Sequence, residues 1–165
     1  MINFNLNTSI YRPLQQVFAF VATPENDFHW QYGTLISAQI SKGEIGMGTL
    51  FRTVSHFMGR RIETMYQVTE FESDKSYGFK SLSGPVDSHT LYTFEVTEGS
   101  TRINVSTQIN PGDLFKSDNA SAEKIVKKQY RENLALLKEV LEASKVDRPL
   151  KHTSLISNRR RSDVR

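Results

Sequence analysis

The segment SHTLYTFEVTEGSTRINVSTQI, residues 88–109, shows most clearly how this chain folds. On both sides of the link Glu98-Gly99-Ser100, apolar or small hydroxyl residues alternate with polar ones, the period of two that is typical of half-buried strands. The residues expected on the inner face are Thr90, Tyr92, Phe94, Val96, Ile103, Val105 and Ile109. The short Gly-containing link predicts a β-hairpin, so the two strands should run antiparallel.

Similar segments fill the chain from Tyr32 to this hairpin. They are seven to thirteen residues long by our reading, rich in Thr, Val, Ile, Tyr and Phe, and separated by Gly-containing or acidic turns, a pattern typical of strands. The predicted strands are 34–41, 48–58, 60–72, 76–83, 88–98 and 101–109. Several links are of hairpin length, so neighbouring strands should form an antiparallel meander.

A long amphipathic helix is predicted at 119–143. Its apolar residues recur at steps of four, four, three and four, which places them on one stripe that can dock on a sheet. These residues are Val126, Tyr130, Leu134, Leu137 and Leu141. Asp118 or Asn119 is the expected N-cap.

The first thirty residues add one strand and two short helices. Residues 2–11 alternate with the period of a strand, and Pro13 suits the first turn of a helix through LQQVFAFVA. Thr23 is expected to cap a second short helix through PENDFHW, where Asp27 and its acidic neighbour Glu25 favour the positive helix end.

The order of these elements predicts an α+β helix-grip fold. Seven antiparallel strands would form a curved sheet wrapped around the long C-terminal helix, with two short helices between strands 1 and 2. A sheet of this width is too broad for one helix to cover flat, so it must curl. The enclosed space then becomes either packed core or a cavity.

The charge of the chain is uneven. The 165 residues carry a net charge of +3, but residues 145–165 hold seven Lys or Arg and two Asp, so residues 1–144 carry −2. We therefore predict a folded domain at 1–144 and a basic flexible tail at 145–165. The folded part also lacks the interleaved aromatic and basic residues of an RNA-binding sheet, so no nucleic-acid partner is expected.

Several other classes are disfavoured. The chain has no Cys, no apolar run long enough to cross a bilayer and no recognisable secretory signal, so we expect a cytoplasmic protein without a transmembrane segment. The four His residues have no partner at helical metal-site spacing, so neither a metal nor a cofactor is expected. No Gly-x-Ser-x-Gly elbow supports a hydrolase triad.

The element order and a series of short motifs resemble a known superfamily. The motifs are Arg12-Pro13 with Val17-Phe18-Ala19-Phe20-Val21, Pro24-Glu25-Asn26, Trp30, Gly46-Met47-Gly48-Thr49, Gly59-Arg60, Val68-Thr69-Glu70-Phe71-Glu72, Ser83-Gly84-Pro85, Tyr92-Thr93-Phe94, Thr101-Arg102-Ile103 and Asn133-Leu134. Together they resemble the START-like (SRPBCC) superfamily, and most closely its polyketide cyclase/dehydrase-type members. The resemblance implies a deep cavity between the concave sheet face and the last helix. The superfamily hosts carriers, sensors and enzymes, so the fold alone sets no function.

The side chains expected to line that cavity mix aromatic walls with a few hydroxyls. They are Phe51, Thr53, Tyr66, Tyr77, Phe79, Thr90, Tyr92, Phe94, Tyr130, Leu134 and Leu137. This composition suits a mainly apolar molecule that one or two polar groups orient. The alternative is that the aromatics fill a solid core, and a register error of one residue would exchange the faces.

Three functional hypotheses follow. The first is a protein that binds a small hydrophobic molecule (lipid-, polyketide- or aromatic-like) as carrier, sensor or store. The second is a cyclase or dehydratase acting on a polyketide-like substrate in the same cavity, although the sequence identifies no catalytic residues. The third is a protein-interaction module that uses the sheet surface or the basic tail. A titratable side chain inside the cavity would favour the enzyme.

Overall fold

The computed structural model describes residues 1–112 and 119–143. The elements are β1 (Ile2–Ile10), α1 (Leu14–Val21), the 3₁₀-helix η1 (Pro24–His29), β2 (Thr34–Gln39), β3 (Leu50–Phe57), β4 (Arg60–Glu72), β5 (Ser76–Ser83), β6 (Asp87–Thr97), β7 (Ser100–Asn110) and α2 (Asn119–Ala143). Their order is the one that the sequence predicts.

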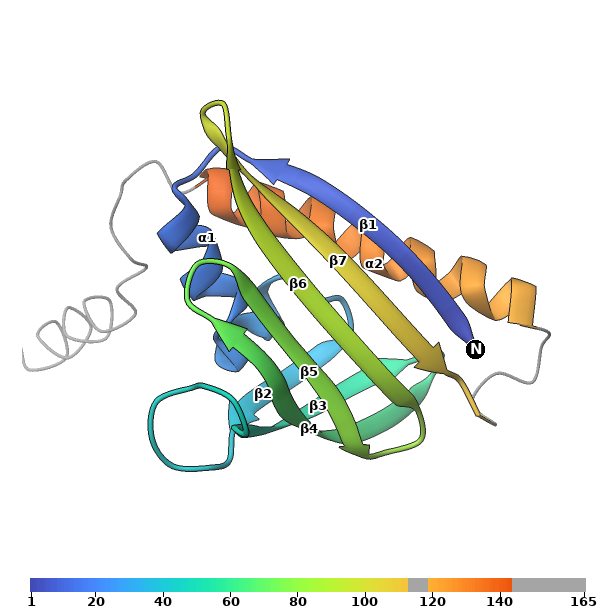
Figure 1. Cartoon of the computed structure of the whole chain (residues 1–165). Helices are drawn as coiled ribbons and strands as arrows, with labels where there is room; N and C mark the ends of the chain where they lie inside the picture. Colours follow the sequence, from blue (N-terminus) through green and yellow to red (C-terminus); the bar gives the residue numbers. More distant parts are fainter. Residues whose placement is uncertain (113–118, 144–165) are drawn as a thin grey trace, which may run out of the picture.

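All seven strands form one antiparallel sheet in the order β1-β7-β6-β5-β4-β3-β2. Only the β1–β7 pair joins strands that are distant in the sequence. Figure 1 shows the sheet strongly curved, with α2 running beside β1 and β7 and α1 at one end of the sheet. The predicted helix-grip architecture is therefore confirmed.

The register of the β6–β7 hairpin also agrees with the sequence pattern. Thr90 lies opposite Thr107 and Tyr92 opposite Val105, and all four side chains are buried. Val96 is the exception, because it is 70% exposed although its partner on β7 is buried. The hairpin extends beyond the core at this end, so Val96 faces solvent although it continues the alternation of the inward residues Thr90, Tyr92 and Phe94.

The inner stripe of α2 divides between two apolar clusters. Val126 packs with residues of β1 and β7 in the smaller cluster, while Leu134, Leu137 and Leu141 belong to the main core with the aromatic residues of the sheet. Tyr130 is partly buried and touches both. Among the helices described, none combines the length and apolar character that crossing a membrane requires.

Two predicted helix caps need comment. Thr23 does not cap η1, because its hydroxyl turns back and donates to the Ala19 carbonyl at 2.7 Å. That interpretation was wrong, since the end of α1 offers the hydroxyl a carbonyl acceptor. The expected N-cap of α2 at Asp118 or Asn119, and the tail at 145–165, lie outside the part of the chain whose side chains are described.

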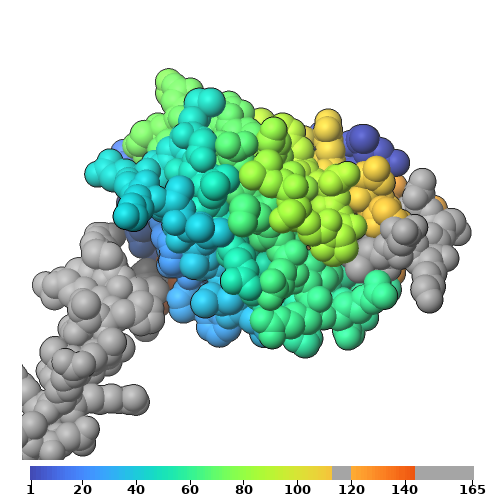
Figure 2. All heavy atoms as spheres, turned by 90° about the horizontal axis from the view of Figure 1, so that it is seen from below, coloured from blue at the N-terminus to red at the C-terminus, as the bar shows by residue number. Residues whose placement is uncertain are grey.

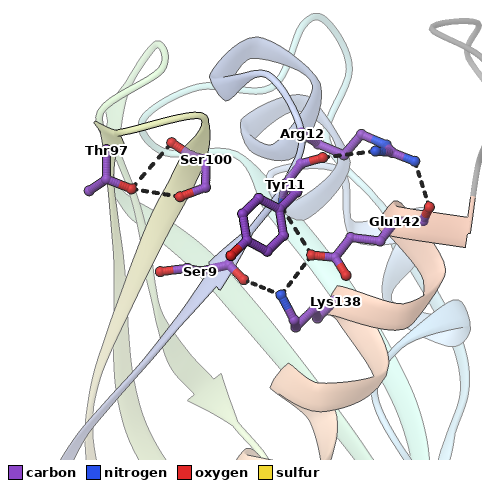
Figure 3. Close-up of polar contacts among 7 residues, drawn as sticks. All are labelled: Ser9, Tyr11, Arg12, Thr97, Ser100, Lys138 and Glu142. Carbon is purple, nitrogen blue, oxygen red and sulfur yellow. Dashed lines mark hydrogen bonds and ion pairs between the residues drawn. The ribbon is translucent and has the colours of Figure 1, made fainter.

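A polar cluster joins the end of α2 to the corner between β1 and α1 (Figure 3). The Tyr11 amide donates to Glu142 Oε1 at 3.0 Å, and Arg12 Nη2 donates to the Glu142 carbonyl at 2.5 Å. Lys138 Nζ donates to the Ser9 carbonyl at 2.7 Å and to Glu142 Oε1 at 2.6 Å. We call these five residues the corner clasp, which fixes α2 against the sheet edge.

Glu142→Gln should weaken the corner clasp. The hydrogen bond from Lys138 is the main cause that lowers the pKa of Glu142, with the Tyr11 amide also contributing. A lowered folded pKa adds stability above the ordinary pKa, and this stability is lost as the pH falls through the lowered value. Because the pair is partly exposed, we expect a loss of under about 1 kcal/mol at neutral pH. Urea unfolding measured from pH 7 to pH 3 should show that the difference in free energy of unfolding between wild type and Glu142→Gln becomes smaller at acid pH. Glu139→Gln, an exposed change on the same helix, should have little effect, and an equal effect there would contradict a specific role for the clasp.

Candidate functional site

Cross-strand pairing brings the predicted site residues of the sheet onto one concave face. The pairs are Ser37–Thr53, Phe51–Tyr66, Tyr66–Ser81, Val68–Phe79, Tyr77–Tyr92 and Phe79–Thr90. The rings are in contact along this face: Phe51 stacks on Tyr66 with centroids 5.1 Å apart, and Phe79 meets both rings edge-on at 5.3 and 5.2 Å. The sequence therefore assigned these side chains to the same surface correctly.

The helix α2 closes this face from the side of β1 and β7. Leu134 and Leu137 lie in the same core cluster as Tyr92 and Phe94. The Tyr130 hydroxyl lies 3.5 Å from Thr90 Oγ1, which in turn is 3.1 Å from Thr107 Oγ1. All eleven predicted side chains thus belong to one inward surface, while their role in binding stays a prediction.

Burial is uneven over this surface. The inward residues of β6 and β7 are sealed: Thr90, Tyr92, Phe94, Val105 and Thr107 are all buried. Accessible surface remains on several inward residues of β3, β4, β5 and α2, namely Thr53, Tyr66, Phe79, Ser81 and Tyr130. In the space-filling view of Figure 2, the atoms of the blue-to-green part of the chain, which includes β2–β5, form a continuous surface.

A surface pocket of about 280 Å³ lies elsewhere, beside the corner clasp. It is lined by residues 11–14 together with Val96, Thr97 and residues 99–101, and by none of the eleven predicted site residues. Exposed Val96 forms part of its wall. This pocket is therefore a feature separate from the concave face.

Asp27 is a buried residue of this interior that was not among the predicted site residues. The sequence pattern placed Asp27 where it favours the positive end of a helix, but the residue is only 8% exposed and its carboxyl group is hydrogen bonded with the Ser37 hydroxyl. Ser37 Oγ lies 3.0 Å from Thr53 Oγ1 on the inward face. Burial raises the pKa of Asp27 well above its ordinary value, the hydrogen bond from Ser37 lowers it, and the charge of Glu25 raises it.

A signal for Asp27 was present in its spacing. Pro24, Asp27 and Trp30 follow one another at steps of three, and all three are buried. A 3₁₀-helix has three residues per turn, so such residues share one face. An Asp three residues before the only Trp of the chain could therefore have been placed on the inward side of η1.

Several tyrosine hydroxyls share the interior with Asp27. Burial is the largest cause that raises the pKa of Tyr66, Tyr77 and Tyr92, and the nearby Asp27 raises each of them further. For Tyr66 and Tyr92, the neighbouring Tyr130 contributes more than Asp27 does. These groups hence surround one region of low polarity, where neutral forms are favoured.

Trp30 completes this region. Its side chain is 1% exposed and its ring lies 6.1 Å from that of Tyr92. Within the described part of the chain, the indole Nε1 is buried and donates no hydrogen bond. An unpaired buried donor of this kind is uncommon in folded proteins. Nor do residues 1–112 and 119–143 contain a group of three potential metal ligands.

Comparisons with known proteins agree with this architecture. A search of curated proteins finds no match. Among solved structures, a START superfamily protein from Mycobacterium smegmatis is 10% identical with a TM-score of 0.72, over 86% of this chain and 97% of that one. The di-domain ARO/CYC BexL from the BE-7585A biosynthetic pathway is 16% identical with a TM-score of 0.69, over 86% and 47%. Ara h 8.0201 is 13% identical with a TM-score of 0.62, over 84% and 97%.

At these identities the structural likeness establishes the fold alone. The family assignment comes from the sequence itself, because the family model described as "Polyketide cyclase / dehydrase and lipid transport" matches residues 1–142. This match covers every described strand and almost all of α2. The chain therefore belongs to the polyketide cyclase/dehydrase and lipid transport family.

Proposed function

We propose that this protein binds a small, mainly apolar molecule between the concave sheet face and α2, as a carrier, sensor or store. The observation that carries the proposal is the partial exposure of Tyr66, Phe79 and Tyr130, three aromatic residues that point into the interior. Rings that filled a solid core would lose this surface. Aromatic walls with a few hydroxyls are typical of sites for apolar ligands.

A second candidate is a cyclase- or dehydratase-type enzyme acting on a polyketide-like substrate. Asp27 favours it, because a buried carboxyl with a raised pKa beside several tyrosine hydroxyls can hold and move a proton. The solved structures of similar fold include one that is named as a di-domain ARO/CYC, BexL. Binding is the more economical proposal, since it requires only the shape and chemistry of the interior.

Native mass spectrometry tests the binding proposal directly. The purified protein should carry a small molecule that is lost under denaturing conditions, and 2-ethylnaphthalene, an apolar probe, should bind in equilibrium dialysis. Phe79→Trp should weaken binding of the probe at least about tenfold, because the larger ring occupies space over β5. Val96→Trp adds the same ring at an exposed position. The proposal fails if no molecule and no probe binds, or if the two variants bind the probe equally well.

A further inference from the structure

We propose that Asp27, Ser37 and Trp30 form a polar end of the interior that binds a neutral oxygen, a carbonyl or phenol group, on the otherwise apolar ligand. The inference rests on the proposed function and names the chemical class that the site selects. Its basis is the position of these three residues. Asp27 lies in η1, Trp30 directly follows η1, and Ser37 lies in β2.

The carboxyl group of Asp27 is held firmly in place. The Asp27 carbonyl accepts hydrogen bonds from the amides of Trp30 at 3.2 Å and Gln31 at 2.8 Å, which fixes the backbone. The side chain is hydrogen bonded with Ser37, and Ser37 in turn with Thr53. A carboxyl group has two oxygens and room for several hydrogen bonds. The Ser37 contact uses only part of this capacity.

Among the residues that the structure describes, no cation balances a negative charge on Asp27. The polar and titratable groups that face it are Glu25 from η1, Ser37 from β2, Tyr66 from β4, Tyr77 from β5 and Tyr92 from β6. None of these groups is basic. Burying an unpaired carboxylate is costly, so the protonated form is favoured and can donate its O–H.

The neighbouring groups are donors of the same kind. The tyrosine hydroxyls are protonated at neutral pH, and burial raises their pKa further. The buried Trp30 Nε1–H donates to no acceptor within the described residues, although a buried donor normally has one. Neutral donors without net charge match an oxygen acceptor on a neutral ligand. They do not match a carboxylate, whose burial is costly, or an ammonium group, which requires an ionised partner.

Four probes with the same ring system test this selection in the full chain. They are 2-acetylnaphthalene (a carbonyl), 2-ethylnaphthalene (similar size, no oxygen), 2-naphthoate (an anion) and 2-(aminomethyl)naphthalene (a cation). Wild type should bind the ketone about fivefold more tightly than the ethyl compound, the contribution of one neutral hydrogen bond. Asp27→Leu should bring this ratio close to one, while Asp27→Asn, a neutral donor, should keep it.

The pH profile separates a protonated carboxyl from a merely structural role. In wild type the preference for the ketone should decline as the pH rises through the pKa of Asp27, whereas in Asp27→Asn it should stay constant. Free energies of unfolding provide a measurement without ligand. Because the folded pKa is raised, wild type should lose stability relative to Asp27→Asn as the pH rises above the ordinary Asp pKa.

Each outcome has a definite meaning. If Asp27→Leu keeps the ketone preference, or if the pH profiles of wild type and Asp27→Asn coincide, the polar end is overturned while apolar binding stands. If the cation binds best and Asp27→Leu abolishes its binding, Asp27 is an ionised counter-ion and the neutral-oxygen assignment is wrong. If neither the ethyl compound nor the ketone binds and the purified protein carries no small molecule, the proposed function itself fails.

Discussion

Gly33→Ala should destabilise the protein by about 3 kcal/mol or more. Gly33 joins η1 to β2 with a φ of +80°, a conformation that L-residues adopt only at a cost of about 1–2 kcal/mol. A Cβ there would lie 2.3 Å from the backbone oxygen of His56. The two backbones cannot separate freely, because the His56 amide donates to the Gly33 carbonyl at 2.7 Å. Overpacking of this kind adds about 1–3 kcal/mol.

Gly99→Ala is the matched control for the backbone conformation. Gly99 has a φ of +67°, but a Cβ there would meet nothing within 4 Å. We expect this variant to lose only about 1–2 kcal/mol. Urea unfolding monitored by circular dichroism measures both values. Equal losses would contradict the close approach of Gly33 to β3. Since Gly33 also sets how β2 follows η1, Gly33→Ala should reduce probe binding as well.

Regular alternation explains why most of the sheet could be predicted. The predicted strands 60–72 and 76–83 coincide with β4 and β5, and the predicted helix 119–143 coincides with α2. These segments are long, and each has one dominant period of apolar residues, two in strands and 3.6 in the helix. Burial of one face selects the same period, so the sequence and the packing point to the same structure.

A β-bulge shows where the pattern stops being informative. The pairing of β4 with β5 shifts between Val68 and Glu70, so Phe71 rather than Glu70 shares the inward face with Tyr77. Phe71 packs against the core, with its ring 5.5 Å from that of Phe18. Phe71 was not among the predicted site residues, because one extra residue in a strand reverses the alternation without a clear sequence signal.

Asp27 was missed for a different reason. An acidic residue near a helix start is normally solvated and favours the helix dipole, so that interpretation was the natural one. Its burial depends on how η1 packs over β2 and brings the carboxyl to Ser37, a tertiary contact that local sequence does not encode. The polar end of the site therefore became visible only once the fold placed these elements together.

Phe51→Ala and Phe79→Ala should differ in their effect on stability, and the difference tests whether the interior is hollow. Both rings lie on the same face with centroids 5.3 Å apart. Phe51 is 1% exposed, so its truncation should cost about 3–5 kcal/mol through lost burial and a cavity. Phe79 is only partly buried. Phe79→Ala should therefore cost at least about 1 kcal/mol less stability than Phe51→Ala, since part of the Phe79 ring already lacks protein neighbours.

Ligand binding should respond in the opposite order. Because Phe79 borders the proposed site with accessible surface, Phe79→Ala should weaken binding of 2-ethylnaphthalene by about fivefold or more, which corresponds to the loss of about one buried methylene equivalent or more. Phe51→Ala, where it remains folded, should bind the probe within about threefold of wild type, because the Phe51 ring is covered by Tyr66 and Phe79. If Phe51→Ala and Phe79→Ala lose the same stability and both bind 2-ethylnaphthalene as wild type does, the two rings belong to one packed core. The concave face would then serve the fold and offer no room for a ligand.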